Sequence, residues 1–504
     1  MPKFDLQPVY HRLEGYRAEM SESLSRLIAF PSVAVRTQGN HPFGDAVQQA
    51  YEAMLEMAAE EGFFVCNLDN FGGHFDLPGK GDQLVGIVGH LDVVPEGDNW
   101  DFPPYGGEIT DGYVCGRGST DDKGPVIACF YAMKALKEAG FVPDKTIRMI
   151  LGLDEESGWE GMKHYVAFAD RLPDCGFTPD GDFPVLHGEK GFLVFNLARK
   201  FGRTTGKGLD LRSFTGGTAA NAVPDFARAV LLDTAQGGYG DIRKLLTELK
   251  ESRGWRIQSR GIGKSLEITV TGTSAHGARP EEGENAISIL MEILGHLNFV
   301  SDEVTEFIRF YNHHIGFELN GQSIGCALED EPSGKLIWNV GKIELDQKSV
   351  QLTVNVRYPV TAEMDQVYDG IAAVVDPYDI GIVKIDHKPP IYFPADDPMI
   401  ETLVEIYRRH TGDEKSQPLV IGGGTYARAM DNIVAFGARF PGEPDLAHQK
   451  NEKISVDNLV LLSKIYADAI AALAGEAEEA AVADDAAPAE ESAEDKATGE
   501  AEEA

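Results

Sequence analysis

Two apolar runs, Leu84–Gly89 and Thr146–Leu153, are typical of buried β-strands, and a helix-like stretch at Lys123–Ala139 lies between them. Strands that alternate with helices indicate an α/β fold with a largely parallel sheet flanked by helices. The neighbouring sequence continues the pattern, with helices predicted at Gly15–Phe30, Gly44–Gly62 and about Glu160–Asp170, and a strand at Phe63–Val65. We therefore expect a mixed, largely parallel sheet.

The pattern changes after His187. Three runs then alternate apolar and polar residues with a period of two, as strands with one buried face do: Phe192–Leu197, Leu266–Thr271 and Val350–Arg357. Helices are predicted among them near Ile242–Glu251, Asn285–Leu297 and Met364–Val375. After Pro389-Pro390 the first pattern returns, with helices at Met399–His410 and Val456–Leu473 and strands near Leu419 and Val434. We expect one discontinuous domain at 1–187 and 389–475, with an inserted α+β domain at 188–388.

The chain has 504 residues, which agrees with two domains rather than one core. Its formal net charge of −36 argues against nucleic acid or an anionic membrane as a partner, and solubility is the simpler interpretation of that charge. Residues 476–504 hold twelve acids, one lysine and no aromatic residue. This composition predicts a disordered acidic tail.

The five cysteines are scattered and form no C-x-x-C pair, so we expect neither a cysteine-type zinc site nor a disulfide framework. The first 20 residues lack the apolar core of a signal peptide. No run approaches the roughly 18 apolar residues of a membrane span. A cytoplasmic location is therefore expected.

A histidine and an aspartate follow the first apolar strand, in His90-Leu91-Asp92. Side chains two apart in a strand point the same way, and a metal-ligating histidine commonly gives its second ring N–H to a carboxylate. The same spacing recurs in His74-Phe75-Asp76, which follows glycines rather than a buried strand. We predict that His74 is a surface residue and that His90 belongs to a site.

Acidic residues occupy three further loops. Asp121 and Asp122 lie between a strand and a helix, where either could simply cap the helix or bind a metal. Asp154-Glu155-Glu156 ends a core strand, where three acids indicate either a solvated loop or a metal ligand beside a general base. Asp180 and a lone His448 have ordinary explanations, a turn and a surface residue.

Taken together, the candidates follow separate elements of the first domain: His90, Asp121, Glu156, Asp180 and His448. Two histidines and three carboxylates, one of them bridging, complete two zinc sites with room for a shared water. Such a pair of ions polarises a carbonyl and activates the water. Glu155 would then act as the general base.

These motifs resemble those of the di-zinc metallopeptidases that include aminoacylase, succinyl-diaminopimelate desuccinylase, carnosinase and glutamate carboxypeptidase. Within that family the chain is most similar to bacterial dipeptidases of the PepV type, also described as Xaa-His dipeptidases. The resemblance covers about residues 10–474 and implies a catalytic domain with an inserted lid. It assigns His90, Asp121 and Asp180 to one zinc, and Asp121, Glu156 and His448 to the other. It also implies that Asp92 supports His90, that Glu155 is the base, and that the Asp121–Asp122 peptide is cis.

The inserted domain carries resembling segments as well. The resemblance implies that Asn221 contacts substrate, that His276 polarises the scissile carbonyl, and that Arg357 binds the free carboxylate of the substrate. Gly423, Gly424 and Thr425 resemble a loop near that carboxylate. Without the family, His276 would be read as a turn residue beside Gly277, and the glycine run as a flexible turn.

These expectations lead to a zinc-dependent dipeptidase for small, unblocked peptides, with cobalt or manganese as possible substitutes for zinc. The alternative within hydrolases is an N-acyl-amino-acid deacylase, which also needs a carboxylate clamp. A non-catalytic binding protein with the same fold is a third interpretation, which the intact Glu155 and ligand set oppose. Since the lid of about 200 residues is long, we expect it to supply His276 within one chain, and therefore a monomer.

Overall fold

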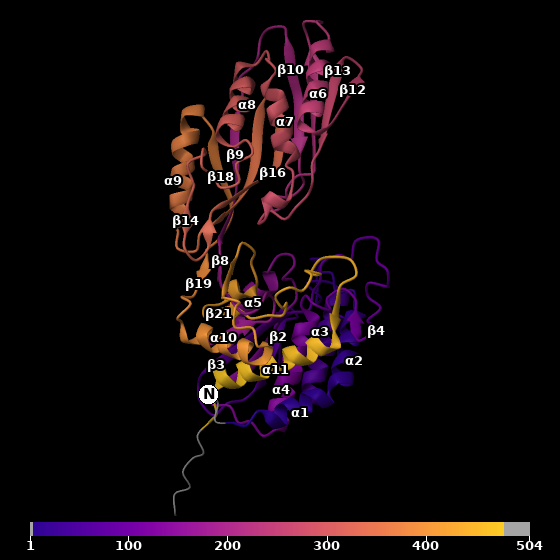
Figure 1. The fold of residues 1–504 in the computed structure, drawn as a ribbon, viewed down its shortest axis with the longest axis vertical. Coiled ribbons are helices and arrows are strands. Elements are labelled where there is room, and N and C mark those ends of the chain that lie inside the picture. The colour runs from indigo at the N-terminus through magenta and orange to yellow at the C-terminus, as the bar shows by residue number, and fades with distance from the viewer. Residues whose placement is uncertain (1–3, 478–504) are drawn as a thin grey trace, which may run out of the picture.

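A computed structural model describes residues 4–477 of the chain. The prediction of a disordered acidic tail falls outside these residues, apart from Glu476 and Ala477. The described chain has two large sheets with separate hydrophobic cores, stacked end to end (Figure 1). We call residues 4–189 and 391–477 the lower unit, and residues 191–388 the upper unit.

The lower unit contains the mixed sheet that the sequence predicts. Its strand order is β1-β2-β6-β3-β7-β21-β8-β19, with β20 beside β8. The central pairs β6·β3, β3·β7 and β7·β21 are parallel, whereas the pairs nearer the edges are mostly antiparallel. The strands are β1 (Phe64–Leu68), β2 (Gly72–Leu77), β3 (Leu84–His90), β6 (Thr146–Gly152), β7 (Cys175–Thr178), β8 (Leu186–Glu189), β19 (Ile391–Tyr392), β20 (Leu419–Ile421) and β21 (Ile433–Ala435).

Helices cover both faces of this sheet, because its central strands are apolar on both. In β3, Val85 and Ile87 join the main core, whereas Val88 packs on the other face with Ile150 and Tyr426. The larger face carries α1 (Gln7–Gly15), α2 (Arg17–Ile28), α3 (Asp45–Glu60), α4 (Lys123–Glu138), α10 (Pro398–Thr411) and α11 (Val456–Ala474). The other face carries α5 (Glu160–Phe168) and η3 (Tyr426–Ala429). A small sheet joins β4 (Glu108–Thr110), β5 (Tyr113–Cys115) and β22 (Lys453–Ser455).

The prediction that His74 is a surface residue was wrong. His74 lies in β2, is 5% exposed, and shares a 2.9 Å hydrogen bond with the hydroxyl of Tyr165. The preceding glycines do not mark a loop, since a Cβ at Gly73 would lie 2.1 Å from the hydroxyl oxygen of Tyr51. Glycine here permits close packing of helix α3 against the strand.

The upper unit is an antiparallel sheet with helices packed on it. Its strand order is β12-β13-β11-β10-β16-β17-β9-β18. In β17 the residues predicted to share one face, Leu352, Val354 and Val356, are all buried, and toward the end of the strand Asn355 and Arg357 are buried as well. The strands are β9 (Gly191–Lys200), β10 (Leu209–Gly216), β11 (Phe226–Asp233), β12 (Arg256–Ile262), β13 (Ser265–Thr271), β16 (Ile337–Asp346), β17 (Ser349–Tyr358) and β18 (Gly381–Lys388).

The helices of the upper unit are α6 (Gly240–Arg253), α7 (Ala286–Gly295), α8 (Asp302–His314) and α9 (Met364–Val375), with short turns η1 (Pro280–Glu282) and η2 (Asp376–Tyr378). A two-stranded hairpin, β14 (Glu329–Asp330) with β15 (Gly334–Lys335), completes it. Helices α1 and α8 had no counterpart in the sequence analysis.

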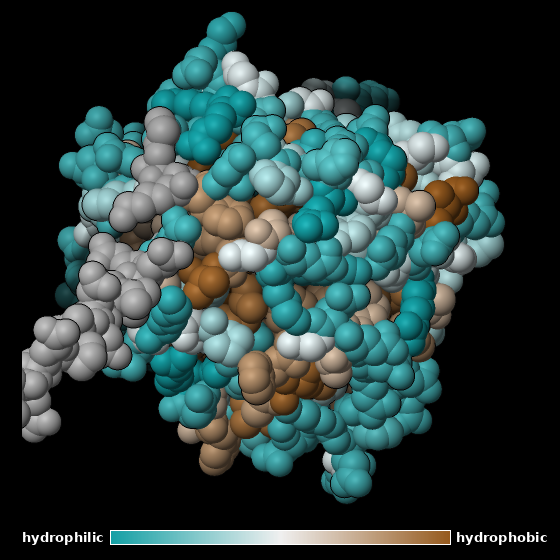
Figure 2. Space-filling view, turned by 90° about the horizontal axis from the view of Figure 1, so that it is seen from below, coloured by the Kyte–Doolittle hydropathy of each residue, from teal (hydrophilic) through white to brown (hydrophobic). Residues whose placement is uncertain are grey.

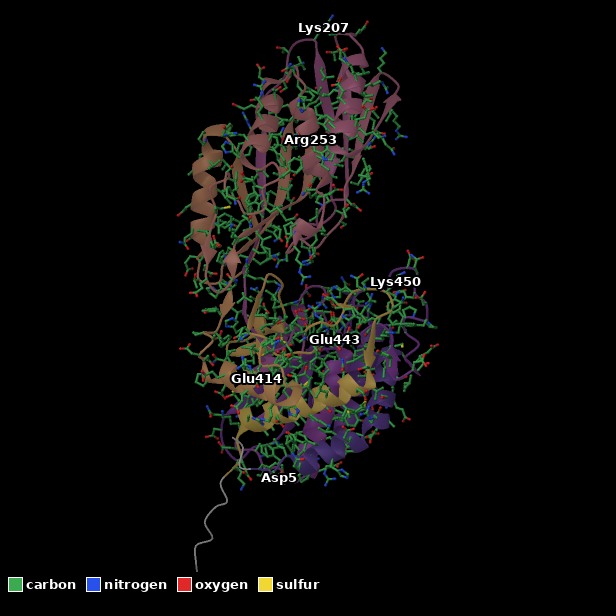
Figure 3. All side chains as sticks on the ribbon, in the orientation of Figure 1. Asp5, Lys207, Arg253, Glu414, Glu443 and Lys450 are labelled. Atoms are coloured by element: carbon green, nitrogen blue, oxygen red, sulfur yellow. The ribbon has the colours of Figure 1, made fainter. Side chains whose placement is uncertain are left out.

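The surface shows where polar and apolar residues lie relative to the units. Seen from below, the lower unit shows apolar patches among a mainly hydrophilic surface (Figure 2). In Figure 3, Lys207 lies at the far tip of the upper unit, whereas Lys450 lies on the side of the lower unit that faces the upper one. None of the helices within residues 4–477 combines the length and the apolar character that a bilayer crossing requires.

Candidate metal centre and substrate site

Three adjacent parallel strands end at the same edge of the lower sheet. His90 is the last residue of β3, Glu155 and Glu156 follow β6, and Asp180 follows β7. The order β6-β3-β7 places these three strand ends side by side. The carboxyl ends of parallel strands are where α/β sheets commonly bind ligands. The topology therefore gathers residues that are 90 positions apart in the sequence.

Asp121 lies between the two histidines. One of its carboxylate oxygens is 3.2 Å from Nε2 of His90, and the other is 3.1 Å from Nε2 of His448. The same His448 nitrogen lies 2.9 Å from Oε1 of Glu156. The Asp121–Asp122 peptide is cis, as the family resemblance implied. A carboxylate with one oxygen on each side can bridge two cations.

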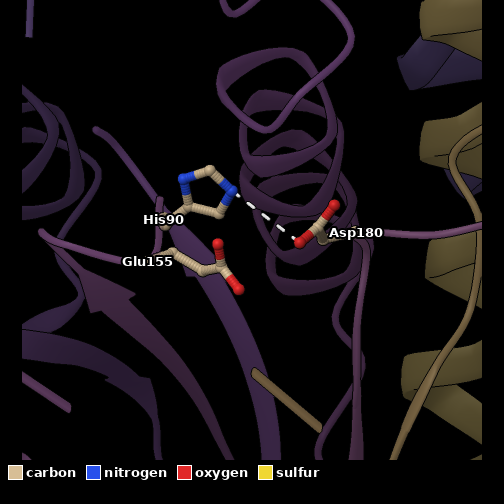
Figure 4. A group of neighbouring side chains, drawn as sticks. All are labelled: His90, Glu155 and Asp180. Atoms are coloured by element: carbon tan, nitrogen blue, oxygen red, sulfur yellow. Dashed lines mark ion pairs between the residues drawn. The ribbon is translucent and has the colours of Figure 1, made fainter. Parts of the chain in front are cut away.

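His90 is held from its other ring nitrogen by Asp92. Nδ1 lies 3.0 Å from the backbone carbonyl of Asp92 and 3.4 Å from its carboxylate. On the opposite side, Nε2 faces Asp180 across 3.8 Å, and the carboxylate of Glu155 lies beside them (Figure 4). Because Nδ1 is engaged, Nε2 is the nitrogen available for a metal.

The residues present fit a metal centre. Nε2 of His90 is buried and has no hydrogen-bond partner within residues 4–477, although carboxylate oxygens converge on it. Two sets of side chains place their ligand atoms within 4.8 Å of one another, namely His90 with Glu155 and Asp180, and His90 with Asp121 and Glu156. Imidazole nitrogen with carboxylate oxygen is a donor set that suits zinc and also other first-row metals.

The electrostatics of the cluster also favour the binding of cations. Burial and the Asp121 charge raise the pKa of Asp180 to about 7, and burial raises the pKa of Glu155 well above its usual value. Hydrogen bonds to Asp121 and Glu156 raise the pKa of His448 to about 11. Crowded carboxylates repel one another in a desolvated site, and cations would relieve this repulsion.

The helix-capping interpretation of the acidic pair is not what the structure shows. Asp122 is the residue before α4, but its side chain makes no capping bond and instead accepts the backbone N–H of His90 at 3.0 Å. Asp154, by contrast, does bind the start of a helix: its carboxylate accepts the backbone N–H groups of Glu160 and Gly161, the first two residues of α5, at 2.6 and 3.0 Å. Asp154 is buried, so the solvated-loop interpretation does not apply to it.

Glu452 is a buried residue whose role the sequence analysis missed. Its Oε2 accepts a 2.7 Å hydrogen bond from Arg117, while Oε1 accepts the N–H and hydroxyl of Thr120 at 2.8 and 2.9 Å. The same oxygen lies 3.3 Å from the N–H of Asp121. Glu452 thus ties the loop of His448 to the loop of Asp121. Its position four residues after the candidate ligand His448 was the available signal.

Trp159 and Tyr426 also border the centre and were not predicted. The indole N–H of Trp159 donates to the backbone carbonyl of Glu155 at 2.7 Å. The ring of Tyr426 contacts Trp159 edge-on at 5.2 Å and His90 at 6.1 Å between centroids. Trp159 has a φ of 58°, which is unusual for a bulky residue. Such local outliers concentrate at functional sites.

In the upper unit, Asn221 and His276 lie on adjoining backbone segments. The carbonyl of Asn221 accepts the N–H of Gly277 at 2.7 Å, and a Cβ at Gly277 would lie 2.8 Å from that carbonyl. Nδ1 of His276 faces the N–H of Ala278 at 3.2 Å, so it acts as the acceptor and Nε2 carries the proton. Partial desolvation and the Arg357, Arg279 and His448 charges lower the pKa of His276, which favours this neutral form.

Arg357 is buried near the junction of the two units. Its guanidinium lies 4.3 Å from the centroid of the Phe192 ring, and its Nε donates to Asn355 at 3.2 Å. Within residues 4–477, no carboxylate lies within ion-pair distance of Arg357, which is 6% exposed. A buried guanidinium without a counter-ion is suited to binding an anion.

The loop Gly422–Thr425 contacts the turn that carries His276. A Cβ at Gly422 would lie 3.2 Å from the Cβ of Ala278, so the two units are in close contact here. No hydrogen bond or ion pair within residues 4–477 joins His276, Asn221 or Arg357 directly to the metal-site side chains. The structure therefore brings the five candidate ligands together, and places the other candidates around the junction above them.

Comparison with known proteins identifies the family. Residues 86–472 match the model of "Peptidase family M20/M25/M40". The chain belongs to this family. The relatives include a Bacillus subtilis protein named "Putative dipeptidase YtjP", 37% identical over 86% of this chain and 92% of that protein. A Staphylococcus haemolyticus protein of the same description is 33% identical over 92% of this chain and 98% of its own length.

Solved structures support the fold of this M20/M25/M40 peptidase. Human carnosine dipeptidase 1 superposes with a TM-score of 0.53 at 19% sequence identity, and the match covers 94% of this chain and 100% of that chain. Aminoacylhistidine dipeptidase from Vibrio alginolyticus gives a TM-score of 0.53 at 16% identity, covering 92% and 97%. The predicted family, the metallopeptidase class and the mixed α/β fold are confirmed.

Proposed function

We propose that this chain is a zinc-dependent dipeptidase that hydrolyses small, unblocked dipeptides. The observation that carries the proposal is the position of Asp121, whose two oxygens approach two different histidines at 3.2 and 3.1 Å. Glu155 lies beside this arrangement, in the same cluster as His90 and Asp180. The relatives named as dipeptidases agree with this substrate class.

The donor set suggests which residues would hold the metals. His90, Asp121 and Asp180 would hold one zinc ion, and Asp121, Glu156 and His448 would hold the other. When bound, the ions polarise the scissile carbonyl and lower the pKa of the attacking water. Cobalt or manganese could fill the same nitrogen and oxygen sites.

Glu155 is proposed to move the proton during hydrolysis. Its carboxylate takes a proton from the attacking water and returns it to the leaving nitrogen, after which the peptide bond is broken. Burial raises the pKa of Glu155, so the group retains a proton more readily after the first transfer. His276 donates its Nε2–H to the carbonyl oxygen while negative charge develops there.

The upper unit is proposed to act as the lid that selects substrate length. Arg357 binds the free carboxylate of the substrate, with Asn221, Gly423, Gly424 and Thr425 around it. The close approach of Gly422 to Ala278 supports a contact between the lid and the unit that holds the metal-site residues. A site closed at the carboxylate end and at the metals admits two residues but not a long chain.

A monomer is the proposed working unit. The turn that carries His276 contacts the Gly422 loop of its own chain, so a second subunit is not needed to supply this histidine. Mass measurement in solution should give the mass of one chain. Recovery of activity on mixing His276→Ala with Glu155→Gln protein would contradict the proposal.

The decisive experiment compares a free dipeptide with its N-acetylated form and with a tripeptide. We expect turnover of the dipeptide alone by zinc-loaded protein, loss of turnover after chelation, and recovery with zinc. Faster turnover of the acetylated form would instead support the alternative, an N-acyl-amino-acid deacylase. Recovery with cobalt and manganese, measured in parallel, ranks the metals.

A further inference from the structure

Two short linkers join the units and run antiparallel beside each other. Residues 189–191 lead from β8 into β9, and residues 388–391 lead from β18 into β19. Glu189 pairs with Ile391 in the lower sheet, and Phe192 pairs with Lys388 in the upper sheet. Any movement of one unit relative to the other must therefore bend both linkers at the same level.

Arg428 contacts both linkers with a single guanidinium. Nη2 donates to the carbonyl of Lys190 and Nη1 to the carbonyl of Pro389, each at 2.6 Å. Nε lies 2.5 Å from Oε2 of Glu189. The side chains of Arg428 and Glu189 are 5% and 2% exposed, so the ion pair between them is shielded from water.

The same pair fixes the loop that precedes Arg428. Oε1 of Glu189 accepts the N–H and the hydroxyl of Thr425 at 3.2 and 2.8 Å, and Nη2 of Arg428 reaches the carbonyl of Gly423 at 3.3 Å. A Cβ at Gly424 would lie 3.0 Å from Nε of Arg428. The glycine run is therefore a loop that packs against the ion pair, and not a flexible turn.

The proposed carboxylate site lies within electrostatic reach of the pair. Burial and the Arg428 charge lower the pKa of Arg357 to about 9, while Glu189 opposes this shift. Loss of the Glu189 charge would leave two guanidinium groups repelling each other beneath the loop. The pair thus affects both the position of the loop and the charge balance around Arg357.

We propose that Arg428 and Glu189 form a hinge clasp, a positioning pair that locks the Gly423–Thr425 loop to both linkers and so sets the geometry of the substrate-carboxylate site. The inference rests on the proposed function for its substrate. Arginine is required because only a planar fork can reach two carbonyl oxygens and a carboxylate together. Lysine would keep the charge but lose this geometry.

The test uses full-length, zinc-loaded Arg428→Lys and Glu189→Gln proteins. We expect KM for a free dipeptide to rise about tenfold while kcat changes little, because the clasp acts on carboxylate binding. The same dipeptide as its C-terminal amide lacks that carboxylate, so its kcat/KM should be equal in variant and wild type. Asp76→Asn, which breaks another partly buried pair, with Arg148 at 2.9 Å, is the matched control and should leave KM unchanged.

Hydrogen exchange separates the clasp from the proposed function. If the wild type hydrolyses no dipeptide, the function fails, whereas the clasp still predicts faster exchange at residues 189–191 and 423–425 in Arg428→Lys. Unchanged KM and unchanged exchange in both variants would overturn the clasp. Equal losses of kcat/KM on the dipeptide and its amide would also overturn it, because they indicate a general structural defect.

Discussion

The carboxylate of Asp92 accepts the backbone N–H groups of Glu155 and Glu156, at 3.0 and 3.1 Å. Asp92 follows β3 and the two glutamates follow β6, so these bonds lock one strand end to the next. The carbonyl of Asp92 also contacts Nδ1 of His90. One residue therefore positions a candidate metal ligand and the proposed base.

Asp92→Asn should reduce activity without unfolding the protein. The amide keeps the shape of the side chain, but its NH₂ group cannot accept one of the two N–H bonds. Loss of a residue that orients metal ligands typically costs about 10–100-fold in activity or metal affinity. Dipeptide turnover and bound zinc, measured on the same samples, check this. Wild-type values for both would show that Asp92 does not position the site.

Glu155→Gln should abolish most turnover while zinc is retained. General acid–base catalysis contributes about 10²–10⁴-fold, and glutamine cannot accept the proton. The exposed neighbour Glu160 is a matched control, and Glu160→Gln should leave kcat nearly unchanged. Near wild-type turnover of Glu155→Gln with full zinc content would exclude the proposed mechanism.

Trp159→Phe should lower kcat by about threefold to tenfold with little change in KM. The indole N–H that holds the carbonyl of Glu155 is lost, whereas most of the ring packing is kept. The ammonium of Lys388 lies 3.8 Å from the centroid of the Trp159 ring, so a cation–π contact survives in weaker form. Steady-state kinetics against Trp255→Phe, a substitution in the upper unit, provide the comparison.

Local patterns in the sequence predicted the elements whose apolar residues recur regularly. β6 and α9 were predicted almost to the residue, because Thr146–Gly152 is mostly apolar apart from Thr146 and Arg148, and Met364–Val375 has helical periodicity. Helix α8 was missed although it buries one face, with Val304 and Phe307 in the core. His74 was misplaced because tight packing, rather than a turn, explains its glycines.

The candidate site was predicted from ordered motifs, whereas the residues that support it were not. His90 and Asp121 belong to local motifs that have chemical meaning on their own. Glu189 and Arg428 are 239 positions apart and meet only because β8 and η3 pack together. No short sequence pattern predicts such a contact. Without the family resemblance, the glycine run before Arg428 was therefore interpreted as a flexible turn.

Glu452→Gln should destabilise the protein by about 3–5 kcal/mol, because it leaves the buried guanidinium of Arg117 without a counter-charge. Both side chains are almost fully buried, at 2% and 0% exposure. The exposed pair Arg26–Glu56, at 51% and 61%, is the control, and Glu56→Gln should cost below about 1 kcal/mol. Chemical denaturation measures both free energies of unfolding. Equal losses in the two variants would contradict the burial argument.

The buried ring of His74 should make stability fall in mild acid. Burial and the Arg148 charge lower its pKa from 6.5 to about 4. Between these values the unfolded chain binds a proton that the folded protein does not, so the free energy of unfolding rises with pH across this window. As the pH falls through this window, His74 lowers the free energy of unfolding by about 3 kcal/mol in total.

His74→Gln should remove this dependence while keeping a hydrogen-bonding group for Tyr165. Urea denaturation at pH 7 and pH 4.5 should show that the variant loses about 2–3 kcal/mol less than the wild type over this range. His11→Gln, at an exposed position, should lose as much as the wild type. If His74→Gln and the wild type lose equal stability, then His74 is not held neutral in the folded protein.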